Sequence, residues 1–320
     1  MDTPVALVIF RRPYHTQRVL EVLAEIRPKR MYVISDGPSK GNEDEALLVK
    51  ECRELIDQIQ WDCEILKNYS EENMGSRRRV VSGLDWVFET EDRAIILEDD
   101  CVPEASFFKF CEELLSKLEH ELRVAGIGGS NVLEEKTQSL VSDYFFSRYP
   151  AIWGWATWRR TWSRYSQNLP KNVVKEVRHH RQFSPSRSNL AYWRSKFGDV
   201  SKGLVDAWDY QLAYLSMKSE QLWVIPRNNQ ISNIGFGEGA THTFDTASAF
   251  SMIRITAASF PLAGPIDIKP EPLYDEALQA RLHHEPLLRR LLIKVFRILP
   301  ASLKARARKH LYRNRRQNHD

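Results

Sequence analysis

Short apolar runs alternate with segments of helical spacing along the first hundred residues. Four runs rich in aliphatic side chains have the length of strands, and they cover residues 5–10, 31–35, 63–66 and 93–97. The segments between them place apolar residues three or four positions apart, as helices with one buried face do, and they cover residues 16–26, 43–59 and 76–89. This alternation predicts an α/β fold with a mixed, mostly parallel sheet that is flanked by helices.

The next part of the chain has a less regular pattern. It predicts strands and helices, in order, over 107–118 (helix), 124–128 (strand), 144–147 (strand), 208–218 (helix) and 222–226 (strand). An aromatic segment occupies residues 152–158. The sequence pattern of residues 172–201 predicts an insertion with helical pieces. A glycine-rich loop at 233–242 follows the last strand.

Three of the predicted strands end in polar or acidic turns. Arg11-Arg12-Pro13 follows the first strand, Asp36-Gly37-Pro38 the second, and Glu98-Asp99-Asp100 the fourth. The carboxyl ends of parallel strands meet at one edge of a sheet, and ligands of open α/β sheets bind there. These turns are therefore expected to form one binding site.

The acidic run Glu98-Asp99-Asp100 is the strongest chemical signal in the sequence. Adjacent carboxylates repel one another unless a cation or hydrogen bonds compensate. Mg²⁺ and Mn²⁺ prefer oxygen ligands and are commonly held by one or two carboxylates together with substrate phosphates. The run is interpreted as a site for such an ion, and a solvated acidic turn is the alternative.

Arginines precede the acidic run. Arg77-Arg78-Arg79 opens the helix before it, and guanidinium groups pair with phosphate oxygens in bidentate fashion. The sequence has no GxxxxGK[ST] loop and no GxGxxG after the first strand, which disfavours a P-loop NTPase and a Rossmann dehydrogenase. A diphosphate bound here would be held by a metal ion and arginines, whereas surface solvation explains any single arginine equally well.

Two aspartates flank a tryptophan at the start of the helix predicted over 208–218. Asp206 and Asp209 on either side of Trp208 suit a helix cap or, in aromatic and partly dry surroundings, a general base. His242 ends the glycine-rich loop, where it is a candidate ligand of a metal or phosphate, although a lone histidine more often has neither role.

The order of these features resembles that of the GT-A glycosyltransferases, most closely those related to N-acetylglucosaminyltransferase I. The resemblance covers roughly residues 4–245 and rests on short motifs in sequence order. They are Arg12 after the first strand, Ser35-Asp36, Glu98-Asp99-Asp100 with Phe107-Phe108 after it, Gly154-Trp155, Trp208-Asp209 and the loop ending at His242. The resemblance implies a Rossmann-like GT-A sheet.

The resemblance also implies roles on the donor side. Arg12 and Asp36 would contact the nucleotide, and Asp99 would contact its ribose. Asp100 would bind Mn²⁺ or Mg²⁺, with Glu98 close to the donor sugar.

Further roles follow from the same resemblance. Asp209 would be the catalytic base, Gly154 and Trp155 would line the acceptor and donor side, and His242 would lie on a loop that closes over the donor. Arg78 and Arg79 align only loosely and are candidates for the diphosphate. The chain has Trp208-Asp209-Tyr210-Gln211 where the family has Trp-Asp-Asp-Trp.

The implied reaction is an inverting, metal-dependent transfer of a sugar from a UDP-sugar to an acceptor hydroxyl. The donated sugar would be GlcNAc or another hexose, and the acceptor a carbohydrate or a lipid-linked glycan. Two alternatives stay open at this point. One is a non-catalytic nucleotide-sugar-binding or scaffold protein on a GT-A fold, and the other is a sugar nucleotidyltransferase.

Charge is distributed unevenly along the chain. Residues 281–320 hold twelve Lys or Arg against two acids, a net +10, so the first 280 residues carry −6 of the overall +4. The basic tail, with an amphipathic helix over 287–299, is expected to contact an anionic membrane surface, and a solvated terminal helix is the alternative. No nucleic-acid partner is expected.

The domain expectation is a GT-A catalytic domain over 1–245, a wrapping or linker segment over 246–280, and a basic helical tail over 281–320. The four cysteines form no CxxC pair and are interpreted as core residues in a reduced compartment. No signal peptide and no apolar stretch of membrane-spanning length is found, so the expected location is the cytoplasm, with peripheral contact at the inner face of the membrane.

Overall fold

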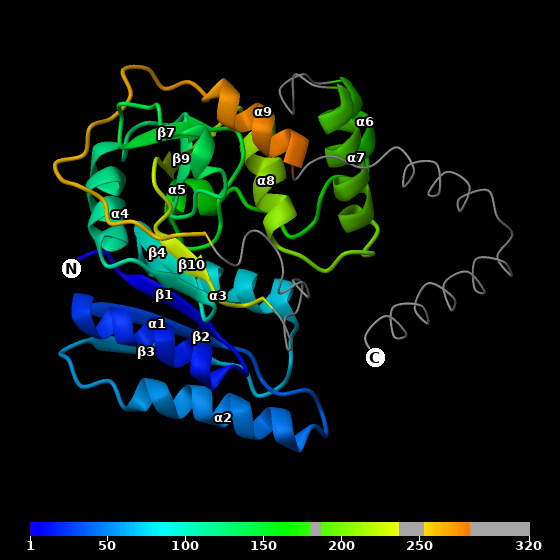
Figure 1. Ribbon diagram of the computed structural model, residues 1–320. Coiled ribbons are helices and arrows are strands. Elements are labelled where there is room, and N and C mark those ends of the chain that lie inside the picture. The colour runs from blue at the N-terminus through cyan, green and yellow to red at the C-terminus, as the bar shows by residue number, and fades with distance from the viewer. Residues whose placement is uncertain (180–186, 237–252, 282–320) are drawn as a thin grey trace, which may run out of the picture.

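The computed structural model describes residues 1–179, 187–236 and 253–281, and its centre is a mixed sheet of eight strands (Figure 1). Their order across the sheet is β3-β2-β1-β4-β8-β6-β9-β7. The strands are β1 (Val5–Ile9), β2 (Arg30–Ser35), β3 (Glu64–Tyr69), β4 (Arg93–Glu98), β6 (Val124–Gly128), β7 (Tyr144–Ser147), β8 (Trp155–Trp158) and β9 (Leu222–Pro226). Strands β7 and β8 run antiparallel to their neighbours and the others run in one direction, so the sheet is mostly parallel.

Helices cover both faces of this sheet. They are α1 (Pro13–Ile26), α2 (Glu43–Asp57), α3 (Ser76–Thr90), α4 (Ser106–Lys117), α5 (Arg159–Trp162), α6 (Val173–His179), α7 (Arg187–Ser201), α8 (Asp209–Lys218) and α9 (Pro272–Arg281), with a 3-10 turn at Glu134–Lys136. One core contains apolar residues of α1, α2 and α4, and the other contains residues of α3, α7 and α8. Alternate residues of β1 enter the two cores, since Leu7 lies in the first and Ala6 in the second.

Local signals start the N-terminal helices close to the strand ends. Pro13 is at the beginning of α1, where its missing amide hydrogen costs nothing. The Asn42 side chain accepts a hydrogen bond from the Glu45 amide at 3.1 Å and caps α2, whose first turn holds three acids that complement the helix dipole. The helices are thereby placed around the carboxyl edge of the sheet.

Most elements predicted from the sequence are confirmed. The strands match the expected ranges to within one residue at each end, except β3, which runs from Glu64 to Tyr69 where 63–66 was expected. The expected helical pieces within 172–201 are α6 and α7. The sequence did not predict β8, α9 or the two-stranded sheet of β5 (Cys101–Pro103) and β10 (Ile231–Asn233).

The segment 253–281 runs back along the molecule to α9. It passes the outside of α4, where the Leu262 amide donates to Glu113 Oε1 at 3.2 Å, and then reaches β7 (Figure 1). There the Glu271 amide donates to the Phe146 carbonyl at 2.7 Å. The buried carboxylate of Asp275 then fixes α9, because it accepts a hydrogen bond from Ser147 Oγ at 2.6 Å.

Three expectations lie outside the described residues. They concern His242, the first part of the wrapping segment (246–252) and the basic tail from residue 282 onward. Among the described helices, none combines the length and apolarity needed to cross a membrane.

Replacement of Asp275 by Asn should weaken the pH dependence of folding stability. Burial raises the pKa of Asp275 to about 6, although hydrogen bonds from Ser147 and Arg148 favour the ionised form. Because this folded-state pKa lies above the unfolded value, the stabilisation from the group is complete below about pH 4 and is lost as the pH rises through about 6. Urea unfolding at about pH 4.5 and pH 7 should show the wild type gaining about 2 kcal/mol relative to Asp275→Asn on acidification. An identical pH response of the two proteins contradicts this assignment.

Candidate active site

The carboxyl ends of β1, β2 and β4 surround a cavity of about 280 Å³. The polar residues at its wall come from the three strand-end turns and from the start of α3, and they include Arg11, Arg12, Asp36, Ser39, Glu98, Asp99, Ser76 and Arg79. The turns that the sequence placed at one edge of the sheet therefore border one cavity. We call it the strand-end cavity.

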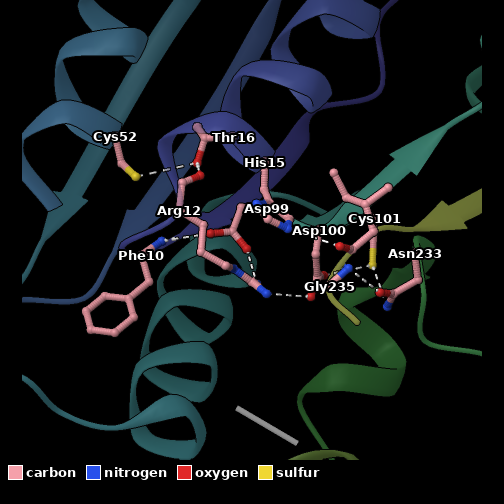
Figure 2. Close-up of polar contacts among 11 residues, drawn as sticks. Phe10, Arg12, His15, Thr16, Cys52, Asp99, Asp100, Cys101, Asn233 and Gly235 are labelled. Atoms are coloured by element: carbon pink, nitrogen blue, oxygen red, sulfur yellow. Dashed lines mark hydrogen bonds and ion pairs between the residues drawn. The ribbon is translucent and has the colours of Figure 1, made fainter. Parts of the chain in front are cut away.

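Arg12 connects the two aspartates of the acidic run (Figure 2). Its guanidinium forms an ion pair with Asp99 and another with Asp100, at 2.9 Å between Nη1 and Oδ2. Asp99 is 2% exposed and also accepts a hydrogen bond from the Phe10 amide at 3.2 Å. The guanidinium thus compensates the repulsion between neighbouring carboxylates, and it has five N–H donors to share among its partners.

Glu98 has a strongly perturbed carboxyl group. Burial raises its pKa to about 8, and the negative charges of Asp100 and Asp99 act in the same direction. The charge of Asp209 makes a further, smaller contribution to this raised pKa.

Asp36 binds the loop that leads into α3. Its Oδ1 accepts hydrogen bonds from the amides of Gly37 at 3.0 Å and Met74 at 2.9 Å, and its Oδ2 accepts one from Gly75 at 3.0 Å. Gly75 has a φ of 79°, in the left-handed region that favours glycine. Asp36 thereby holds the first turn of α3 against the strand-end cavity.

The three arginines of α3 differ in their surroundings. Arg79 is 4% exposed, lines the strand-end cavity and donates a hydrogen bond to Asn68 Oδ1 at 2.8 Å. Arg78 is exposed on the helix surface. Arg77 forms an ion pair with Asp206 at 2.9 Å and so joins α3 to the turn before α8.

Asp100 is in close contact with the segment that follows β10 (Figure 2). The Ile234 amide donates to the Asp100 carbonyl at 2.8 Å. At Gly235 a Cβ atom would lie 2.1 Å from Asp100 Oδ2, so only glycine fits there without displacing the carboxylate. This contact holds the Asp100 side chain, which is 17% exposed.

Asp100 offers one carboxylate to a hard divalent cation, and the Oδ2 of this carboxylate is paired with Arg12. Among the described residues, no group of three or more His, Cys, Asp or Glu is arranged to hold a metal ion. Mg²⁺ needs no such group, because it is usually bound through one or two carboxylates and phosphate oxygens while keeping several waters. The Asp100 side chain is more exposed than that of Asp99, which is buried against Arg12.

A second cavity of about 340 Å³ lies beside Asp209. Its wall is built by the β7–β8 connection and by α7, α8 and α9, and Asp209 is the first residue of α8. The preceding Trp208 is held by stacking on Trp155, with ring centroids 5.7 Å apart, and by a hydrogen bond from Tyr165 Oη to its carbonyl at 3.0 Å. We call this the aromatic cavity.

The surroundings of Gly154 and Trp155 indicate a role in packing. Gly154 has a φ of 59°, and a Cβ atom there would lie 2.4 Å from Ile231. The Trp155 side chain is 1% exposed and packs in the core between Trp208 and Trp223. It therefore contacts the residue that directly precedes Asp209. The sequence predicted Trp155 as a lining residue, whereas its neighbour Trp153 lines the aromatic cavity.

Several residues of the aromatic cavity were missed by the sequence reasoning. The missed aromatic residues are Tyr149, Trp153, Tyr192, Trp193, Tyr210 and Tyr274. The aromatic segment 152–158 was a signal for one of them, but nothing in the sequence indicated that Tyr274 of α9 returns to this wall.

The fold and site together define a mixed α/β protein with a polar cavity at the carboxyl edge of its sheet. No protein-family model matches the chain, and no curated protein matches it. Among solved structures, it is similar to an apo UDP-glucose pyrophosphorylase (9% identity, TM-score 0.36, 73% of this chain and 93% of that chain). It is also similar to mouse xyloside xylosyltransferase 1 in its apo form (10% identity, TM-score 0.32, 70% of this chain and 84% of that chain). These scores are low, so the fold assignment rests on the strand order and register alone.

Proposed function

We propose that this chain is an inverting, metal-dependent glycosyltransferase of the GT-A kind that moves a sugar from a UDP-sugar to an acceptor hydroxyl. One observation carries the proposal. Asp209 lines the aromatic cavity, and the turn before it is joined to the helix that borders the strand-end cavity, because Arg77 of α3 forms an ion pair with Asp206 at 2.9 Å while Ser76 and Arg79 line that cavity. Transfer of a sugar between two substrates requires a base at the acceptor and groups that bind the donor. Asp209 beside the aromatic cavity would be the base, and the acidic run beside the strand-end cavity would belong to the donor site.

In this proposal the strand-end cavity receives the nucleotide sugar. Asp36 and Arg12 contact the nucleotide, Asp99 the ribose, and Glu98 lies near the donor sugar. Arg78 and Arg79 are the diphosphate candidates, and the burial of Arg79 at the cavity wall supports its role. The resemblance to enzymes related to N-acetylglucosaminyltransferase I favours GlcNAc or another hexose as the donated sugar.

The reaction is a single displacement. The acceptor oxygen forms a bond to the anomeric carbon, Asp209 takes the acceptor proton, and the bond to the diphosphate breaks with its electron pair leaving on UDP. Asp100 would hold the Mn²⁺ or Mg²⁺ ion, which would supply positive charge beside the leaving diphosphate. Arginine at the cavity wall adds to this stabilisation.

A thermal-shift experiment tests the donor site directly. UDP with Mn²⁺ should raise the melting temperature of the full chain by more than UDP alone or Mn²⁺ alone, because a ligand that binds only the folded state stabilises it. Asp100→Asn should abolish the extra shift that Mn²⁺ gives. A shift that is the same with and without the metal contradicts metal-dependent binding and favours a scaffold protein.

Product analysis separates the enzymatic alternatives. A panel of nucleotide sugars incubated with Mn²⁺ should yield UDP from one of them, with water as a slow acceptor. Release of pyrophosphate from UTP and a sugar 1-phosphate would identify a nucleotidyltransferase instead.

A further inference from the structure

The aromatic cavity is lined almost entirely by aromatic and aliphatic side chains. Six of the lining side chains are aromatic, and Pro150, Ile152 and Leu278 are among the aliphatic ones. Apart from the tyrosines and tryptophans, the described lining residues with polar side chains are Ser130 and Asp209. The volume of about 340 Å³ is in the range of small-molecule sites, about 300–1,000 Å³.

Each tyrosine hydroxyl in this wall has a hydrogen-bond partner within the protein. The pairs are Tyr149 with Asn189 at 3.2 Å, Tyr192 with Tyr210, and Tyr274 with the backbone of Val132. A sugar ring in the cavity would bury several hydroxyl groups, and each of them would need a partner in place of water. Because the tyrosine hydroxyls are already engaged, the wall provides few such partners.

Contacts among the rings themselves preform the wall. Trp193 stacks on Tyr149 with ring centroids 5.8 Å apart, and it meets Tyr192 and Tyr210 edge-on at 5.2 and 6.4 Å. A preformed wall needs little rearrangement on binding, which lowers the entropic cost of taking up a ligand. Water beside such a wall finds few polar partners, so its displacement by an apolar group favours binding.

An ammonium group is the rival ligand, because the faces of aromatic rings attract cations. The rings around Trp193 are partly engaged with one another, which leaves less ring surface for a cation. An ammonium group would also give up strong hydration beside a wall with few polar groups. Because Asp209 interacts within the protein as well, its charge is not counted for or against any ligand.

We propose that the aromatic cavity binds an uncharged apolar group, the alicyclic or aromatic ring of a small molecule, and not a sugar ring. This binding does not depend on the glycosyltransferase proposal. In the proposed reaction, the bound group would be the apolar part of an acceptor that carries the reacting hydroxyl, in place of the carbohydrate expected from the sequence.

Ligand binding by the full chain, without donor or metal, tests this inference. The probe is 4-tert-butylcyclohexanol, which is compared with methyl hexosides of similar size and with its own carboxylate and ammonium analogues. Ligand-observed NMR titration gives the dissociation constants. We expect the alcohol to bind at least about tenfold more tightly than any of the other compounds, because it buries apolar surface without losing hydration of polar groups. Absence of alcohol binding, or equal or tighter binding of a hexoside or a charged analogue, overturns the inference.

Removal of one aromatic side chain locates the binding site. Trp153→Ala should weaken binding of the alcohol about tenfold, because the ring loses an apolar contact surface. Trp61→Ala is the matched control, since Trp61 is also half-buried but lies before β3 and donates to the Pro28 carbonyl at 3.3 Å. Equal effects of the two variants on the dissociation constant contradict the assignment to this cavity.

A polar substitution in the wall should change the preference. Ile152 is half-buried in the lining, and Ile152→Gln should lower the affinity for the alcohol relative to that for the hexosides. An unchanged ratio in a variant with a normal melting temperature contradicts the apolar site.

Donor hydrolysis with a panel of nucleotide sugars is measured in parallel. Its absence with every nucleotide sugar refutes the glycosyltransferase proposal and leaves the binding result intact. Failure of the alcohol to bind, combined with hydrolysis of a nucleotide sugar, refutes only the apolar ligand class.

Discussion

Asp209→Asn is expected to lower sugar transfer by about 10²–10⁴-fold while donor binding is retained. The amide has the size of the carboxylate but accepts no proton from the acceptor hydroxyl. Asp209 opens α8, where the lost charge weakens the interaction with the helix dipole by about 0.3–1 kcal/mol, and folding of the variant is checked by its melting temperature without ligand. The measurement combines kcat/KM for transfer with the thermal shift that UDP and Mn²⁺ produce.

Asp206→Asn is the matched control for this experiment. Asp206 lies on the other side of Trp208, its side chain is 61% exposed, and it pairs with Arg77. Its substitution should leave transfer nearly unchanged, because an exposed ion pair contributes about 0–1 kcal/mol. Retained transfer by Asp209→Asn would remove Asp209 from the role of base.

Arg12→Met should destabilise the fold by about 3–5 kcal/mol at pH 7. The substitution keeps most of the apolar stem of Arg12 but leaves Asp99, which is 2% exposed, without its guanidinium partner. Arg18→Met in α1, the helix that Arg12 precedes, is the control, since both side chains of its pair with Glu21 are about half exposed and the pair contributes about 0–1 kcal/mol. Urea unfolding of the three proteins gives the comparison.

The loss of folding stability caused by Arg12→Met should become smaller as the pH falls. Burial raises the pKa of Asp99, and the charge of Arg12 opposes this effect. Without Arg12 the folded-state pKa rises further, so the carboxyl group takes up a proton at a higher pH than in the wild type. A group with a raised folded-state pKa stabilises the fold at low pH and loses that contribution as the pH rises. A destabilisation that is the same at pH 5 and pH 7 would show that Asp99 is not the buried charge responsible.

Strands buried on both faces were predictable from the sequence, because their apolar runs are continuous. β1, β4 and β9 are of this kind. β3 lies at an edge of the sheet and has exposed residues at Glu64 and Lys67, so only part of it appeared as an apolar run. β8 was missed because its antiparallel position between β4 and β6 depends on pairing with distant residues.

Contacts between distant residues also limited what the sequence could predict about the candidate active site. The convergence of the three turns followed from the rule that parallel strands end at one edge. The ion pairs of Arg12 with Asp99 and Asp100 join residues 87 and 88 positions apart, and no local pattern encodes such a contact. The aromatic cavity depends on α9, which the chain brings back only after residue 271, so its wall was not predictable from spacing.

The stacking of Trp155 on Trp208 gives the turn before α8 an optical signature. The two rings lie 5.7 Å apart at an interplanar angle of 21°, close enough for their electronic transitions to couple. Such coupling produces a circular dichroism signal in the near ultraviolet whose sign and size depend on the relative orientation of the rings. Because Trp208 directly precedes Asp209, the orientation of the turn that carries Asp209 can be followed by near-ultraviolet circular dichroism in the absence of any substrate.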